Sequence, residues 1–242
     1  MKKEELQQAI PAEIKSRREF FKISGLAVAG AGLLLTGCNN DDDGTPSDSQ
    51  LPGMRNGTFD LGGGDLGILT YAYALEQLEA EFSTRVVTAT GFTTAFNAEE
   101  QQMMLDIYNH EVIHRATLRN LLNELLPDPS TQLLPDLQFN FGNLNFSDRN
   151  AVLQMANTLE ETGIAAYNGA GKYITDPENL NLAGKIVSVE GRHASAIRQL
   201  LNQDNMDFAP TPLDPARPPS QILTEINNMN LITTDFTAMH LQ

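Results

Sequence analysis

Apolar side chains recur at helical spacing in four long segments, which are residues 65–88, 98–126, 147–174 and 182–201. Asn97, followed three residues later by Glu100, is typical of a helix N-terminus, and Pro127 ends the second segment. Ser147 is the expected N-cap of the third. No alternation of apolar and polar residues typical of strands is present. We therefore predict an all-α fold, with one further short helix near residues 220–229.

The connection between the second and third segments, residues 127–146, is about 20 residues long and rich in Pro, Asn, Asp and Phe. A loop of this length is unusual in a compact domain unless it crosses from one end to the other. Asp176 and Pro177 are expected to end the third helix. The pattern predicts a four-helix bundle of two helical hairpins, with a long crossover between helices 2 and 3.

Two of these helices carry the string Glu-x-x-His, as Glu111 with His114 and as Glu190 with His193. Residues three apart share a helix face, so each pair presents a carboxylate and an imidazole in one direction. Both pairs lie on the apolar stripe of their helix, where core residues are expected. A single Glu-x-x-His string is weak evidence for a metal site. Two such strings, both on core stripes, favour a metal site in the bundle.

The helix before each Glu-x-x-His helix carries a Glu on its inward face. Glu76 lies on the helix before Glu111 and His114, and Glu160 on the helix before Glu190 and His193. The chain then repeats one plan twice. Glu79 competes with Glu76 as the inward carboxylate, and Glu161 competes weakly with Glu160. The predicted ligand set consists of Glu76, Glu111, His114, Glu160, Glu190 and His193.

Four carboxylates would balance the charge of two divalent cations, and carboxylate with imidazole suits iron or manganese. Without metal, buried carboxylates this close would repel one another, and some would have to bind protons. Tyr167, two turns after Glu160 on the same face, would hydrogen-bond a ligand carboxylate or carry an electron; an ordinary core tyrosine is the competing interpretation.

A zinc protease is the main competing interpretation of the first string. His110, Glu111 and His114 match H-E-x-x-H, in which both histidines bind zinc and the glutamate is a general base. The longer form with Gly and a third His is absent from residues 115–125, and the second Glu-x-x-His stays unexplained. In the bundle, His110 points off the stripe, and its substitution should leave metal binding largely intact.

The N-terminus resembles a bacterial export signal. Residues 16–22 (SRREFFK) resemble a twin-arginine motif, an apolar run follows over 23–36, and residues 35–38 (LTGC) resemble a lipobox. We predict a signal over residues 1–38, with lipidation of Cys38, and then a flexible acidic linker over 39–62. This places the protein in the cell envelope, anchored to the membrane, and leaves periplasmic and surface-exposed locations open.

The net charge of the chain limits the classes of partner that it is expected to bind. The chain has 31 acidic against 16 basic side chains, a formal net charge of −15, which disfavours nucleic acid. We expect one bundle domain over residues 63–203 and a C-terminal extension over 204–242. The sequence leaves the oligomeric state open.

Three segments resemble the ferritin-like desiccation-related proteins. Residues 75–82 (LEQLEAEF), 159–170 (LEETGIAAYNGA) and 189–194 (VEGRHA) are similar to that family's L-E-x-L-E-A-E-F-Y, L-E-D-x-G-x-x-A-Y-x-G-A and E-x-x-H-A helices. The resemblance implies a ferritin-like four-helix bundle, a carboxylate-bridged dimetal centre with the ligand set named above, and a link to stress. Ser83 stands where that family has Tyr.

These observations lead to one hypothesis and two alternatives. The protein is expected to be an exported, lipid-anchored ferritin-like protein with two metal ions, iron or manganese. It would oxidise Fe(II) or reduce O2 or peroxide, as a ferroxidase, peroxidase or catalase does. The alternatives are a non-catalytic stress lipoprotein with a stabilising metal site, and the zinc metalloprotease.

Overall fold

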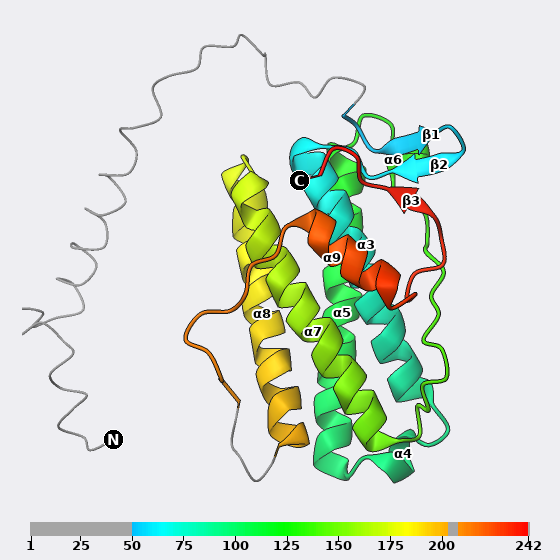
Figure 1. Ribbon diagram of the computed structural model, residues 1–242, viewed down its shortest axis with the longest axis vertical. Coiled ribbons are helices and arrows are strands. Elements are labelled where there is room, and N and C mark those ends of the chain that lie inside the picture. Colours follow the sequence, from blue (N-terminus) through cyan, green and yellow to red (C-terminus); the bar gives the residue numbers. More distant parts are fainter. Residues whose placement is uncertain (1–49, 203–207, 242) are drawn as a thin grey trace, which may run out of the picture. The chain divides into compact units, whose positions relative to one another are not determined.

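Four long helices lie side by side in the computed structural model, which describes residues 50–202 and 208–241 (Figure 1). They are α3 (Gly64–Thr88), α5 (Ala98–Leu125), α7 (Arg149–Ala170) and α8 (Pro177–Leu201). Helix α3 packs mainly against α5, and α7 against α8. The all-α bundle with a long crossover is therefore confirmed. The predicted signal, Cys38 and linker residues 39–49 lie outside the described residues.

The helix ends follow side-chain capping. Asn97 and Glu100 form the expected capping box at the start of α5. The N-cap of helix α7 lies one residue later than predicted, because Asp148 and not Ser147 accepts the free backbone N–H groups. Asp176 caps α8 with Pro177 in its first turn, so this pair starts the fourth helix five residues before the predicted position. A single 3-10 turn, η1 (Gly171–Tyr173), joins α7 to it.

The crossover runs along the bundle from one end to the other (Figure 1). It contains one short helix, α6 (Pro129–Gln132), and two turns, at residues 142–143 and 146–147. Buried Gln77 of α3 holds it: its amide nitrogen donates to the Pro135 carbonyl at 3.3 Å, and its amide oxygen accepts from Leu137 N at 2.9 Å. Lower down, Phe141 and Phe146 pack on Phe82, with ring centroids 5.6 and 6.0 Å away. These contacts give the long loop one conformation.

A three-stranded sheet at one end of the bundle was not predicted. Strands β1 (Gly53–Arg55) and β2 (Thr58–Asp60) form an antiparallel hairpin, and β3 (Phe236–Thr237) pairs with β2 in parallel. Asn56 and Gly57 make the hairpin turn with positive φ angles of 52° and 87°, the conformation that a two-residue turn requires. The expectation of no strands is therefore wrong. Residues 50–62 also pack against the bundle, with Leu51, Phe59 and Leu61 buried, so they are not part of a flexible linker.

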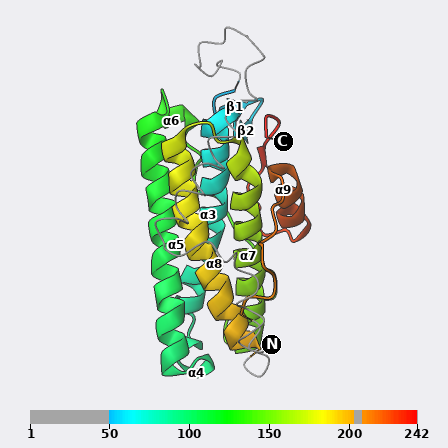
Figure 2. The same ribbon diagram turned by 90° about the vertical axis from the view of Figure 1, so that its left-hand side faces the viewer.

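The C-terminal extension lies along the outside of α7 (Figure 2). It carries α9 (Pro219–Asn228), close to the predicted short helix. Arg217 N donates to the Ala165 carbonyl at 2.9 Å, and Gly169 permits this approach, since a Cβ there would stand 1.8 Å from the Arg217 carbonyl oxygen. A short helix, α4 (Phe92–Ala95), sits between α3 and α5. Among the described helices, none has the length and apolar character needed to cross a membrane.

Candidate metal centre

Six polar side chains from four helices meet in the middle of the bundle. Helix α3 contributes one Glu, α7 another, and α5 and α8 each a Glu and a His three residues apart, which places both on the inner face. All six are buried, and the most exposed retains 9% of its surface. They are the predicted set: Glu76, Glu111, His114, Glu160, Glu190 and His193.

The six side chains form two overlapping groups, each of which could hold a metal ion. One consists of Glu76, Glu111, His114 and Glu190, with one donor atom from each within 4.8 Å of the others. The second replaces Glu76 and His114 by Glu160 and His193, under the same limit. Glu111 and Glu190 therefore belong to both groups.

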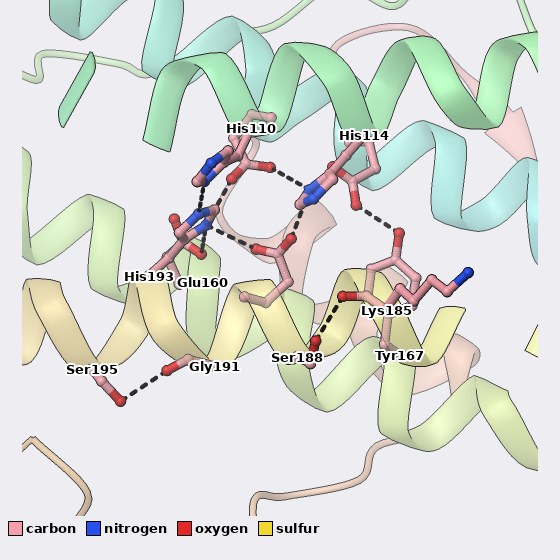
Figure 3. A network of polar contacts seen from close by, with 12 residues as sticks. His110, His114, Glu160, Tyr167, Lys185, Ser188, Gly191, His193 and Ser195 are labelled. Atoms are coloured by element: carbon pink, nitrogen blue, oxygen red, sulfur yellow. Dashed lines mark hydrogen bonds and ion pairs between the residues drawn. The ribbon is translucent and has the colours of Figure 1, made fainter. Parts of the chain in front are cut away.

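Both imidazoles face the carboxylates (Figure 3), and the distances from each Nδ1 to the carboxylate oxygens are nearly the same in both halves. His114 Nδ1 lies 2.9 Å from Glu190 Oε1, 3.4 Å from Glu111 Oε2 and 3.6 Å from Glu76 Oε2. His193 Nδ1 lies 2.9 Å from Glu111 Oε1, 3.3 Å from Glu160 Oε2 and 3.4 Å from Glu190 Oε2. Glu111 and Glu190, which both groups share, thus each turn one oxygen toward each imidazole.

The donor atoms lie within ion-pair distance of one another, but most of them form no hydrogen bond. Both Nδ1 atoms, both oxygens of Glu111 and Glu190, and one oxygen each of Glu76 and Glu160 are buried without a hydrogen-bond partner. Unsatisfied buried polar atoms are rare in folded proteins, because each costs about 1–3 kcal/mol. Eight of them directed at a common space, all carboxylate oxygen or imidazole nitrogen, fit a pair of cations better than they fit each other.

Several side chains of the cluster have pKa values far from their usual ones. Burial raises the pKa of Glu76 to about 8, and burial also raises the pKa of Glu160 well above its usual value. Burial would lower the pKa of His114 and His193, but the surrounding carboxylates outweigh it and raise both to about 12. The metal-free site therefore keeps extra protons in place of missing positive charge, and a cation would displace them.

Tyr167 contacts the first group. Its hydroxyl donates a 2.6 Å hydrogen bond to Glu76 Oε1, and burial raises its pKa well above the usual value, which keeps the proton on the phenol. The corresponding position on α3 is Ser83, whose hydroxyl bonds the Ala80 carbonyl. Glu160 therefore lacks a tyrosine partner, and the two halves of the site differ.

His110 contacts His193, which was not predicted from the sequence. Its Nδ1 lies 2.9 Å from Nε2 of His193, and the two rings stack 5.2 Å apart with an interplanar angle of 9° (Figure 3). The outer nitrogen of His193 is thus held from α5, while its inner nitrogen faces the carboxylates. His110 is exposed and belongs to neither group of donors. This arrangement differs from H-E-x-x-H, in which His110 and His114 would bind the same ion.

The two competing carboxylates have other surroundings. Glu161 pairs with Arg198, away from the donor groups. Glu79 is buried beside the centre, with Oε2 lacking a partner, but no donor group includes it. Glu76, by contrast, is a member of the first group. The structure therefore brings together the set that was predicted with Glu76.

A small apolar cavity adjoins the centre. Its volume is about 10 Å³, and its lining residues are mainly apolar. Ala72 and Leu118, one turn from Glu76 and His114, line it together with Tyr167. Tyr167 therefore stands between this cavity and the donor atoms.

Comparison with known families agrees with this geometry. A family model described as a ferritin-like domain matches residues 64–203, which span all four long helices and all six donor residues. No curated protein matches the chain.

Proposed function

We propose, from the premise that the chain belongs to the ferritin-like family, that its bundle holds two metal ions and uses them to oxidise Fe(II) or to reduce O2 or peroxide. The observation that carries the proposal is the overlap of two buried donor groups through Glu111 and Glu190. Two carboxylates shared in this way fit one dinuclear site better than two separate mononuclear sites.

Each residue has a definite role in the proposed site. Glu111 and Glu190 would contribute to both ion positions; Glu76 and His114 would complete one, and Glu160 and His193 the other. Four carboxylates balance two divalent cations, so the loaded cluster is neutral in the bundle core, where net charge is costly. The donors suit iron best and manganese as an alternative.

The surroundings support chemistry with small oxidants. Two bound iron ions supply two electrons in total, which matches a two-electron oxidant. Tyr167 holds Glu76 in one orientation, and His110 fixes the ring of His193. The cavity beside Tyr167 is only about large enough for one water-sized molecule, and its apolar wall favours an apolar molecule such as O2 over water. Buried walls keep bulk water from the donor atoms.

Export and anchoring form a separate part of the proposal. The twin-arginine and lipobox resemblances support export to the cell envelope and lipidation of Cys38. Because twin-arginine export carries folded proteins, the metal would be inserted before export. Substituting Cys38 by Ala should release the protein from the membrane fraction, and substituting Arg17 and Arg18 by Lys should leave it in the cytoplasm. Membrane retention of the Cys38→Ala protein would contradict the anchor.

Metal content and turnover test the function together. Protein purified from its native envelope should carry two ions per chain by elemental analysis and consume O2 or peroxide when supplied with Fe(II). Protein without metal, and protein with Glu111→Gln, serve as controls. A fully loaded protein inert toward both oxidants would contradict the enzyme and favour the non-catalytic stress lipoprotein.

A further inference from the structure

We propose that a pocket between α3, α5 and the crossover binds a small aromatic carboxylate that carries a hydrogen-bond donor at its far end. None of the six donor residues of the metal centre lines this pocket. The pocket is therefore a second site, and its occupation does not require metal in the bundle.

The pocket has the size of a small-molecule site. Its volume is about 320 Å³, and such sites commonly measure about 300–1,000 Å³. Helix α3 contributes Tyr73, α5 contributes Arg115 and Arg119, and the crossover contributes Asp136 and Phe139. Two guanidinium groups, a phenol, a carboxylate and an aromatic ring thus line one space.

The two arginines of the pocket have no partner in the described part of the protein. Arg115 and Arg119 are four residues apart and share a face of α5, so their positive charges repel each other. Neither guanidinium forms an ion pair or a hydrogen bond within residues 50–202 and 208–241, although the chain has 31 acidic side chains. Guanidinium groups bind carboxylates through charge-assisted, often bidentate hydrogen bonds. An anion from solution would therefore find two strong donors here.

Tyr73 adds a buried donor to the pocket. The residue retains 1% of its surface, and its hydroxyl has no hydrogen-bond partner among the residues that the structure describes. Burial raises the pKa of this phenol, and the charges of Arg119, Asp136 and Arg115 also act on it, so the hydroxyl lies close to all three groups. A protonated phenol beside two guanidinium groups can donate to the anion that they bind.

The remaining polar groups of the pocket define the charge of the ligand. The amide of Gln77 is already bonded to the crossover, and Glu81 pairs with Arg85 at 2.7 Å. Asp136 is exposed and forms no ion pair with any described residue. Two guanidinium charges against the one carboxylate of Asp136 leave one net positive charge, which a monocarboxylate neutralises. Asp136 then accepts a hydrogen bond from the donor of the ligand.

The apolar part of the pocket indicates the body of the ligand. Phe139 and Tyr73 line the pocket together with buried Leu137. Flat aromatic molecules pack well against such side chains. A ring with a carboxylate at one end and a hydroxyl at the other offers one group to the arginines and one to Asp136. The simplest molecule of this kind is 4-hydroxybenzoate, which serves as the probe.

Calorimetric titration of the purified protein with 4-hydroxybenzoate tests the site. We expect saturable binding of one molecule per chain. Benzoate lacks the hydroxyl, and 4-hydroxybenzyl alcohol lacks the carboxylate. Each should bind about 10-fold more weakly, as expected for the loss of a hydrogen bond to a charged group.

Variants assign the binding to the pocket. Arg115→Gln and Arg119→Gln should each weaken the binding of 4-hydroxybenzoate about 10-fold. Asp136→Asn should weaken the binding of 4-hydroxybenzoate but not of benzoate, since only the former offers a hydroxyl to this carboxylate. Arg119 and Asp136 are exposed, so their substitution should leave the fold intact. Arg192→Gln is the matched control, because Arg192 is exposed on α8 and does not line the pocket.

The metal centre is tested separately with Glu111→Gln. This variant should lose metal and still bind 4-hydroxybenzoate as wild type does, which supports two independent sites. Loss of the probe from Glu111→Gln would place it at the metal centre and overturn the second site. The absence of saturable binding by wild type, or an equal loss in Arg119→Gln and Arg192→Gln, would also overturn it.

Discussion

The Tyr167 hydroxyl donates a 2.6 Å hydrogen bond to Glu76 Oε1, joining α7 to α3 across 91 positions of sequence. The bond satisfies one oxygen of Glu76 and leaves the other near His114, without a hydrogen-bond partner. A phenol on one helical hairpin therefore orients a proposed metal ligand on the other.

Loss of this bond should weaken the site. In Tyr167→Phe, one oxygen of buried Glu76 loses its donor, at a cost of about 1–3 kcal/mol in unfolding free energy. We expect metal affinity at the Glu76 position to fall about 10–100-fold. Denaturant unfolding and metal titration measure both. Tyr71→Phe is the matched control, because the Tyr71 hydroxyl is buried without a hydrogen-bond partner. An equal effect of both substitutions would contradict a specific role for Tyr167.

His110 separates the dinuclear site from the zinc protease. His110→Ala removes a ring that stacks on His193 and contacts its outer nitrogen but belongs to neither donor group, so two ions should still bind, with affinity reduced about 10–100-fold. His114→Ala removes a donor of the first group and should abolish binding at that position. Complete loss of metal from His110→Ala, together with peptide hydrolysis by wild type, is the result that the protease requires.

The metal-free protein should lose stability as pH rises. The Glu76 pKa is raised from 4.5 to about 8, so between these values the folded state holds a proton that the unfolded state has lost, and stability falls with pH. Above about pH 6.5 the raised pKa values of His114 and His193 act in the same direction. Thermal unfolding from pH 5 to 8 should show a falling midpoint without metal. With metal bound the fall should be smaller, because cations replace the protons; parallel curves would refute this.

Two glycines should respond in opposite directions to alanine. Gly169→Ala places a Cβ against the Arg217 carbonyl and should destabilise the protein by about 1–3 kcal/mol while loosening the C-terminal segment. Gly184→Ala, on an exposed face of α8 with open space around it, should stabilise by about 0.8–1 kcal/mol. Urea unfolding compares the two. A neutral Gly169→Ala would mean that the C-terminal segment does not depend on this close contact.

Much of the bundle could be predicted because its signals are periodic. Helical spacing located four helices, and the three-residue spacing of Glu111 with His114 identified two donors on one face. Asp176-Pro177 shows where this reasoning fails: an Asp cap and a Pro are equally consistent with the end of one helix and the start of the next. In the structure the Asp176 side chain accepts hydrogen bonds from Glu178 N and Asn179 N, which shows that this pair starts α8.

The missed features depend on contacts between distant segments. Asn56-Gly57 is a strong turn signal, but its strands are three residues long and too short to show alternation. The ring of His110 meets His193, 83 positions away, on another helix. Gly163 on α7 leaves room for the Glu79 side chain on α3, since a Cβ there would stand 2.7 Å from Glu79 Oε1. Helix periodicity cannot reveal such pairs, because they are set by packing between helices.

Anomalous diffraction from crystals of the iron-loaded protein tests the central claim most directly. The account predicts two iron peaks in the bundle, with Glu111 and Glu190 each contacting both, and at most one weakly occupied peak in Glu111→Gln. Exposed Glu124→Gln, also on α5, should retain two peaks. A single ion in wild type, or two ions that share neither Glu111 nor Glu190, would contradict the dinuclear centre.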